Sequence, residues 1–126
     1  MVWLAYGTSG LVALAIIAIG VGYLANPAGM TRSFGLPLPE HGPHTAWWLR
    51  LKGVRDIVAG LALLAMMAWS GPREVGLLLL VDGLIPVGDM LLVLAAKGSA
   101  RTAFGVHGLT AVLMALSAAV LLGGVS

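Results

Sequence analysis

The chain has 126 residues, of which 60% are hydrophobic and 10% are charged, and its mean hydropathy is +1.01. In soluble domains roughly a quarter of the residues are charged, so this composition predicts one small domain inside a membrane. The seven Lys and Arg give a net charge of only +2, and several lie inside apolar runs, which argues against nucleic-acid binding. Because there is no cysteine, disulfides, thiol catalysis and thiolate metal sites are excluded.

Four apolar runs are long enough to cross a bilayer, which takes about 20 helical residues. They cover residues 3–25, 45–69, 75–96 and 102–123. The first run has no basic segment before it, so we interpret it as a retained span rather than a signal peptide. Short connections after the second and third runs favour antiparallel neighbours. The sequence therefore predicts an all-α, antiparallel four-helix transmembrane bundle that forms one domain over residues 1–126.

A long connection, residues 26–44, separates the first two predicted spans. It is rich in proline, and Phe34, Leu36 and Leu38 give it apolar anchors. Such a segment either folds over the bundle as a lid or serves as an interfacial linker, and the sequence leaves both alternatives open.

The distribution of basic residues predicts the orientation. Arg32, Lys97 and Arg101 belong to the first and third loops, whereas Arg73 alone belongs to the second. Because cytoplasmic loops are enriched in Lys and Arg, we expect both termini to face outward. The expected location is therefore integral to the membrane, in the plasma membrane.

Residues 47–60 open the second predicted span and carry an unusual number of charges for a membrane helix. A single charged residue at the centre of such a helix costs about 2.5–3.5 kcal/mol on insertion scales, so charges there are candidates for function. At 100° per residue, Lys52, Arg55 and Asp56 share one face with Trp48. We expect this face to point into the bundle.

The other predicted spans also carry polar residues. Asp82 and Asp89 are seven positions apart, and hence on one face of the third span, with Pro86 predicting a kink between them. The fourth span contributes His107, and the first contributes Tyr23 near its end. For His107 alone, a hydrogen-bonded packing residue is the more common explanation in membrane helices, and the sequence does not exclude it.

Helical rise gives the depth of these groups in the membrane. Asp56 and Asp82 both approach the middle of a hydrocarbon core roughly 30 Å thick, whereas Asp89 and His107 lie closer to the basic side. We therefore expect Asp56 and Asp82 to face each other around one polar pocket, with Arg55 pairing with carboxylates. The alternative is that these buried charges merely determine which helices become neighbours.

No cofactor or metal site is predicted. Glu40, His41 and His44 lack the regular spacing of ligands and have no fourth partner. The glycines form neither a phosphate-binding loop nor a dinucleotide fingerprint, and no nucleophile elbow is present.

Several motifs carry a resemblance that spans essentially the whole chain. FGLP in the first loop, LKGVRDIVAG entering the second span, VDGLIPVGD in the third and the histidine of the fourth resemble a family of small four-helix integral membrane proteins. The family occurs in actinobacteria and filamentous fungi and is known mainly as a domain of unknown function. Some fungal members resemble membrane-bound epoxide hydrolases of polyketide pathways. The resemblance implies a site formed by Arg55, Asp56, Asp82 and Asp89.

The implied chemistry suits paired carboxyl groups. Opening an epoxide with water needs a base that takes a proton from water and an acid that protonates the departing oxygen. Soluble limonene-epoxide hydrolases use an Asp-Arg-Asp set for such a reaction, and Asp56, Arg55 and Asp82 form an analogous set. His107, Lys52, Tyr23 and Trp48 are expected to contact the substrate.

The expected partners are a lipophilic small molecule and the lipid bilayer, and a homo-oligomer is left open. Two other functions compete with the hydrolase. One is a small proton-coupled carrier or lipophile-binding subunit, in which Asp82, Asp89 and His107 pass protons or bind a cation. The other is a purely structural partner of another membrane protein.

Overall fold

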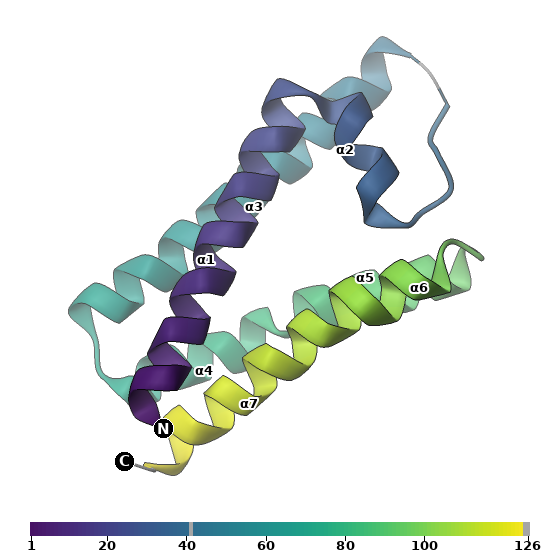
Figure 1. The fold of residues 1–126 in the computed structure, drawn as a ribbon. Coiled ribbons are helices and arrows are strands. Elements are labelled where there is room, and N and C mark those ends of the chain that lie inside the picture. Colours follow the sequence, from purple (N-terminus) through teal and green to yellow (C-terminus); the bar gives the residue numbers. More distant parts are fainter. Residues whose placement is uncertain (41, 125–126) are drawn as a thin grey trace.

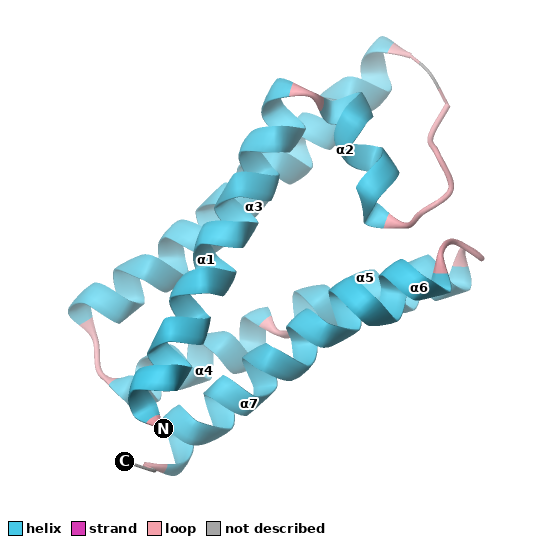
Figure 2. Cartoon of the chain, viewed as in Figure 1, coloured by secondary structure: helices cyan, strands magenta, loops and turns pink. Residues whose placement is uncertain are grey.

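We describe the structure from a computed structural model of the chain, over residues 1–40 and 42–124. All regular structure in this part of the chain is helical (Figure 2). The elements are α1 (Val2–Ala25), α2 (Pro27–Phe34), α3 (Pro43–Trp69), α4 (Pro72–Asp82), α5 (Leu84–Ala95), α6 (Ala100–Thr102), the π-helical turn η1 (Ala103–Gly108) and α7 (Leu109–Gly123). The all-α prediction is confirmed.

The predicted number of helices is one too low. Four long helical segments are joined by the short helix α2, which makes five over the described residues. The sequence forms α2 because Asn26 Oδ1 accepts a hydrogen bond from the backbone N–H of Gly29 at 3.1 Å, and Pro27 occupies the first turn. Gly35 ends the helix in the left-handed conformation, at φ 98°. An eight-residue helix is too short for hydrophobic periodicity to reveal it.

Three segments are long and apolar enough to cross a membrane, each 24 residues long: Val2–Ala25, Pro72–Ala95 and Ala100–Gly123. This finding indicates a membrane protein. The segment α3 is longer, at 27 residues, but it contains the charged residues of the 47–60 stretch.

The long helices pack as two antiparallel pairs, and these two pairs form the arms of a V (Figure 1). One arm consists of α1 and α3, and the other of α4 and α5 packed against η1 and α7. We call the end where the arms meet, close to the N-terminus, the closed end, and the opposite end the open end. Helix α2 lies at the open end, between the arms.

Glycines bring the two helices of the first arm close together. A Cβ atom at Gly53 would lie 2.6 Å from the backbone oxygen of Gly20, and one at Gly60 would lie 2.7 Å from that of Ala13. Small residues allow such close approach, which maximises van der Waals contact where no hydrophobic effect drives helices together.

The core lies at the closed end. Its buried apolar residues come from α1, α3, α4 and α7: Ala5, Val12, Ala13, Leu63, Val75, Leu79, Met114, Ala118 and Leu121. Ser9 of α1 and Ser117 of α7 are buried as well. This packing fixes the angle between the arms, so the open end is held apart rather than filled.

The third long helix is interrupted at Gly83, between α4 and α5. Pro86 lacks an N–H group and its ring crowds the carbonyl of Asp82, four residues earlier. The hydrogen bond from Val87 N to Gly83 O is correspondingly long, at 3.4 Å. The interruption lies where proline predicts a kink in the sequence.

Candidate functional site

Helix α2 bridges the two arms at the open end. The backbone carbonyl of Phe34 accepts a hydrogen bond of 2.8 Å from His107 Nε2, and the backbone N–H of Ser99 donates to Gly35 O at 2.7 Å. The rings of Phe34 and His107 also lie 4.5 Å apart between centroids. Segment 26–44 is therefore attached to the second arm, which favours the lid alternative over the linker.

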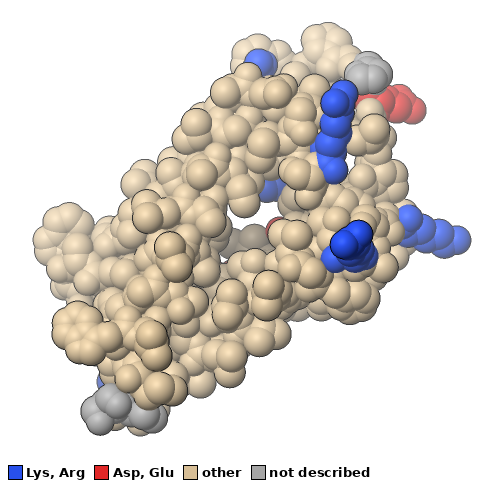
Figure 3. All heavy atoms as spheres, viewed as in Figure 1, with Lys and Arg blue, Asp and Glu red and all other residues tan. Residues whose placement is uncertain are grey.

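A cavity of about 130 Å³ lies beneath α2, and we call it the inner cavity. Figure 3 shows an opening between the two arms in this region. The cavity is lined from both arms and from α2 by Ile16, Ile19, Tyr23, Met30, Ser33, Phe34, Lys52, Asp56, Ala59, Ile85, Pro86, Asp89, Val106, His107 and Thr110. Most of these side chains are apolar, with a small group of charged ones.

The first arm contributes an ion pair to this cavity. Lys52 Nζ lies 2.6 Å from Asp56 Oδ2, one helical turn away on α3. The same ammonium lies 4.4 Å from the ring centroid of Tyr23 and 5.1 Å from that of Phe34. Two aromatic faces and one carboxylate thus surround part of the Lys52 ammonium, whose side chain is 31% exposed.

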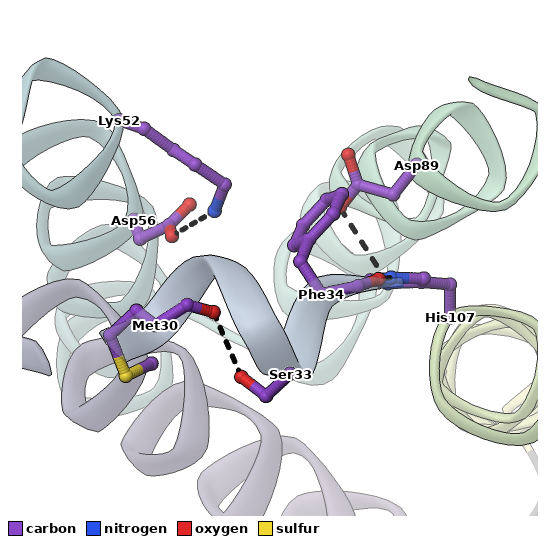
Figure 4. A network of polar contacts seen from close by, with 7 residues as sticks. All are labelled: Met30, Ser33, Phe34, Lys52, Asp56, Asp89 and His107. Atoms are coloured by element: carbon purple, nitrogen blue, oxygen red, sulfur yellow. Dashed lines mark hydrogen bonds and ion pairs between the residues drawn. The ribbon is translucent and has the colours of Figure 1, made fainter. Parts of the chain in front are cut away.

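The second arm contributes a carboxylate and an imidazole. Asp89 Oδ2 lies 3.9 Å from His107 Nδ1, and the His107 side chain is only 9% exposed (Figure 4). Since a carbonyl oxygen only accepts hydrogen bonds, the bond to Phe34 places a hydrogen on Nε2. The other ring nitrogen, Nδ1, is the one that lies 3.9 Å from Asp89 Oδ2.

His107 projects from the π-helical turn η1. Turns of this kind are rare and occur frequently at functional sites. The turn includes Gly105 and Gly108, which weaken helix propensity locally and leave room for the wider backbone.

The structure brings five of the sequence-predicted residues together: Tyr23, Lys52, Asp56, Asp89 and His107. Figure 4 shows the charged ones projecting from the two arms toward the space between them. Polar groups that are far apart in the sequence thus converge on one cavity.

Three predicted residues lie elsewhere, and the pairing of Asp56 with Asp82 is corrected. Asp82 does not line the inner cavity, and Asp89 occupies the place expected for it. The two aspartates share a face, but seven residues of helix separate them by about 10 Å along the axis. Because the arms diverge, only the residue nearer the open end reaches the cavity.

Arg55 and Trp48 are corrected in the same way. Arg55 is exposed, and over residues 1–40 and 42–124 it forms no ion pair. Lys52, one turn earlier on α3, pairs with Asp56 in its place. Trp48 is 70% exposed and lies outside the inner cavity. His41, weighed as a metal ligand, falls outside the described residues.

Sequence reasoning missed the role of Phe34. Its backbone carbonyl positions His107 and its ring covers Lys52. The motif FGLP was the available signal, because a glycine directly after an apolar residue suggests the end of a short helix.

The fold and the cavity define an all-helical membrane protein with a charged site between two helical arms. Residues 13–121 match the family described as "Domain of unknown function (DUF4267)". The chain therefore belongs to this family. No curated protein and no solved structure matches it.

Proposed function

We propose that this protein is a membrane-embedded hydrolase that opens lipophilic epoxides with water. In this proposal all four long helices cross the membrane, including α3 with its charges. One observation carries it: two carboxylates with different partners line the same cavity, Asp56 beside Lys52 at 2.6 Å and Asp89 beside His107 at 3.9 Å.

The different partners supply the two halves of the reaction. Asp89, beside His107, takes a proton from water as the water oxygen forms a bond to an epoxide carbon. Lys52, held by Asp56, gives a proton to the epoxide oxygen as its bond to that carbon breaks. The proton gained by Asp89 then returns to Lys52, so the sum of the steps is addition of one water to give a diol.

A membrane location suits this chemistry. Lipophilic epoxides partition into the bilayer, and a site between helices is reached without leaving it. The mostly apolar lining of the inner cavity also lowers the local dielectric constant, which strengthens the electrostatic interactions between the charged groups and the reacting atoms.

The test is diol formation by purified protein in detergent, supplied with a lipophilic epoxide and isotope-labelled water. Asp89→Asn is expected to lower kcat by about 10²–10⁴-fold, the usual contribution of a general base. Asp56→Asn should also lower kcat, because Lys52 then loses the carboxylate that holds it. Asp82→Asn is the matched control, because Asp82 lies outside the cavity, and its turnover should stay close to that of the unsubstituted protein. Isotope label from the water that appears in the diol during the first turnover indicates direct attack by water on the epoxide.

Two results count against the hydrolase. Full turnover in Asp89→Asn would remove the acid-base mechanism, and absence of diol from every lipophilic epoxide tried would remove the activity. The proximity of Asp89 and His107, two titratable groups 3.9 Å apart inside the bundle, also favours a second candidate, a proton-coupled carrier. Proton-dependent uptake of a lipophile into vesicles, without diol formation, supports that candidate.

The orientation belongs to the same proposal. Basic side chains gather toward the open end in Figure 3, and the segments that connect the long helices there include Arg32, Lys97 and Arg101. We propose that the open end faces the cytoplasm and that both termini face outward across the plasma membrane. Protease cleavage of both termini in intact cells, with residues 26–44 protected, is the expected pattern, and the reverse pattern excludes this orientation.

A further inference from the structure

A second, larger cavity lies next to the inner one, and we call it the outer cavity. Its volume is about 290 Å³, which approaches the lower limit for pockets that hold drug-sized ligands, roughly 300 Å³. It lies under the chain that follows α2 and is lined by Tyr23, Thr31, Phe34, Leu36, Pro37, Pro39, Leu49, Lys52, Asp89 and Leu92. Neither the sequence nor the family description assigns it a role.

The two cavities meet at four residues that line both: Tyr23, Phe34, Lys52 and Asp89. The junction therefore carries an ammonium and a carboxylate from opposite arms. Away from it the walls are mostly apolar on both sides, with Ile16, Ile19, Ala59, Ile85 and Pro86 in the inner cavity and Leu36, Pro37, Pro39, Leu49 and Leu92 in the outer one. The polar wall residues away from the junction are Ser33, Asp56, His107 and Thr110 in the inner cavity and Thr31 in the outer one.

This arrangement constrains the shape of a ligand. A molecule that places a polar group at Lys52 and Asp89 has mostly apolar walls on both sides of that group. It matches both walls only if it carries apolar arms in both directions. Because the outer cavity has more than twice the volume of the inner one, the two arms differ in length.

We propose that the two cavities form one binding site for an unbranched apolar chain, with its polar group in the interior of the chain and its longer arm in the outer cavity. This inference rests on the proposed function for the identity of the polar group. The substrate class is then an internal epoxide of a long chain rather than a terminal epoxide.

Access to both cavities supports this ligand class. Ile85 lines the inner cavity and is 46% exposed, and Leu92 lines the outer cavity and is 63% exposed, so each cavity has a wall residue that is accessible from outside the protein. A chain dissolved in the bilayer therefore meets both cavities from the side, between the arms, without passing through water.

The first experiment measures binding without chemistry. The probe is a long unbranched chain with an interior cyclopropane, an unreactive ring of the same size as an epoxide, and a diazirine at the end of its longer arm. In protein reconstituted in vesicles, light should attach the probe to residues of the outer cavity, such as Leu49 and Leu92, as mapped by mass spectrometry. Labelling spread evenly over lipid-facing residues overturns the proposed site.

A pair of neighbouring residues provides the matched variants. Leu92→Trp fills the outer cavity, whereas Leu91→Trp introduces the same side chain at a 56% exposed position that lines neither cavity. Attachment of the probe should fall with Leu92→Trp and stay unchanged with Leu91→Trp. Equal attachment to both variants also overturns the proposal.

The second experiment measures hydrolysis of internal and terminal epoxides of equal carbon number. Internal epoxides should be preferred, and Leu92→Trp should lower kcat/KM for those with a long outer arm by about 10-fold or more, since a methylene in an apolar pocket is worth 10–200-fold. A preference for terminal epoxides overturns the proposal that the polar group lies in the interior of the ligand chain, but it does not contradict the proposed hydrolase activity. Site-directed labelling without any hydrolysis supports the binding site and removes the hydrolase.

Discussion

The closed and open ends of the V are built on different principles. At the closed end the packed residues are mostly apolar, and Leu63, Leu79, Met114 and Leu121 are almost fully buried. At the open end the contacts between the arms are polar and pass through α2, and two cavities lie between them. The same four long helices thus provide stability at one end and a site at the other, because the arms diverge between the two.

A substitution in the apolar core of the closed end should destabilise the protein more than any other change considered below. Leu79→Ala removes a side chain that is 1% exposed, and it should lower the free energy of unfolding by about 2–5 kcal/mol. Leu80→Ala is the control: its side chain is 51% exposed and its loss leaves no internal cavity. Unfolding in a denaturing detergent measures both. Equal losses for the two variants would show that the core does not lie where the structure places it.

A smaller effect is expected within the first arm. Gly53→Ala brings a methyl group to 2.6 Å from the backbone oxygen of Gly20, so α1 and α3 must separate, with a loss of about 1–3 kcal/mol typical of overpacking. This loss occurs although alanine favours helix more than glycine does. In Gly7→Ala the new Cβ meets no atom within 4 Å, and the substitution should be neutral or stabilising. The same unfolding measurement ranks the two, and a stabilising Gly53→Ala contradicts the close approach.

The smallest effect concerns the lid. His107→Ala removes the hydrogen bond to the Phe34 carbonyl, a contribution of about 0.5–1.5 kcal/mol, so α2 should detach more often. Hydrogen exchange at the backbone amide of Ser99, which bonds Gly35 O, should then be about 2- to 10-fold faster. His107→Gln keeps an N–H donor at a similar reach and should restore slow exchange. Unchanged exchange in His107→Ala means that His107 does not hold the lid.

Much of the fold follows from the sequence, because hydropathy and helical rise depend only on local residues. The predicted spans 3–25 and 45–69 lie close to α1 (Val2–Ala25) and α3 (Pro43–Trp69). Helix α2 escaped detection because it is stabilised by its Asn26 cap and by contacts to the second arm rather than by a repeating apolar face.

The candidate site was predictable in composition but not in pairing. Helical spacing indicated which side chains share a face, and it selected Lys52, Asp56, Asp89 and His107 among others. It did not indicate which residues of different helices lie at the same level, since this depends on loop geometry and on the angle between the arms. For that reason Asp82 was paired with Asp56, although the divergence of the arms places Asp89 at the cavity.

The π-helical turn divides the fourth long helix into two parts whose rotational phases are set separately. Packing of Met114, Ala118 and Leu121 at the closed end fixes the phase of α7. Contact between Gly35 and Thr102 at the open end fixes that of α6. In a regular α-helix, the rotation about the axis that packing requires at one end also turns the side chains at the other end. A π turn contains an extra residue, so the side chains before and after it can take different rotational positions. The fourth long helix is therefore continuous, but the rotational phases of its two parts are independent, and His107 lies in the turn between them.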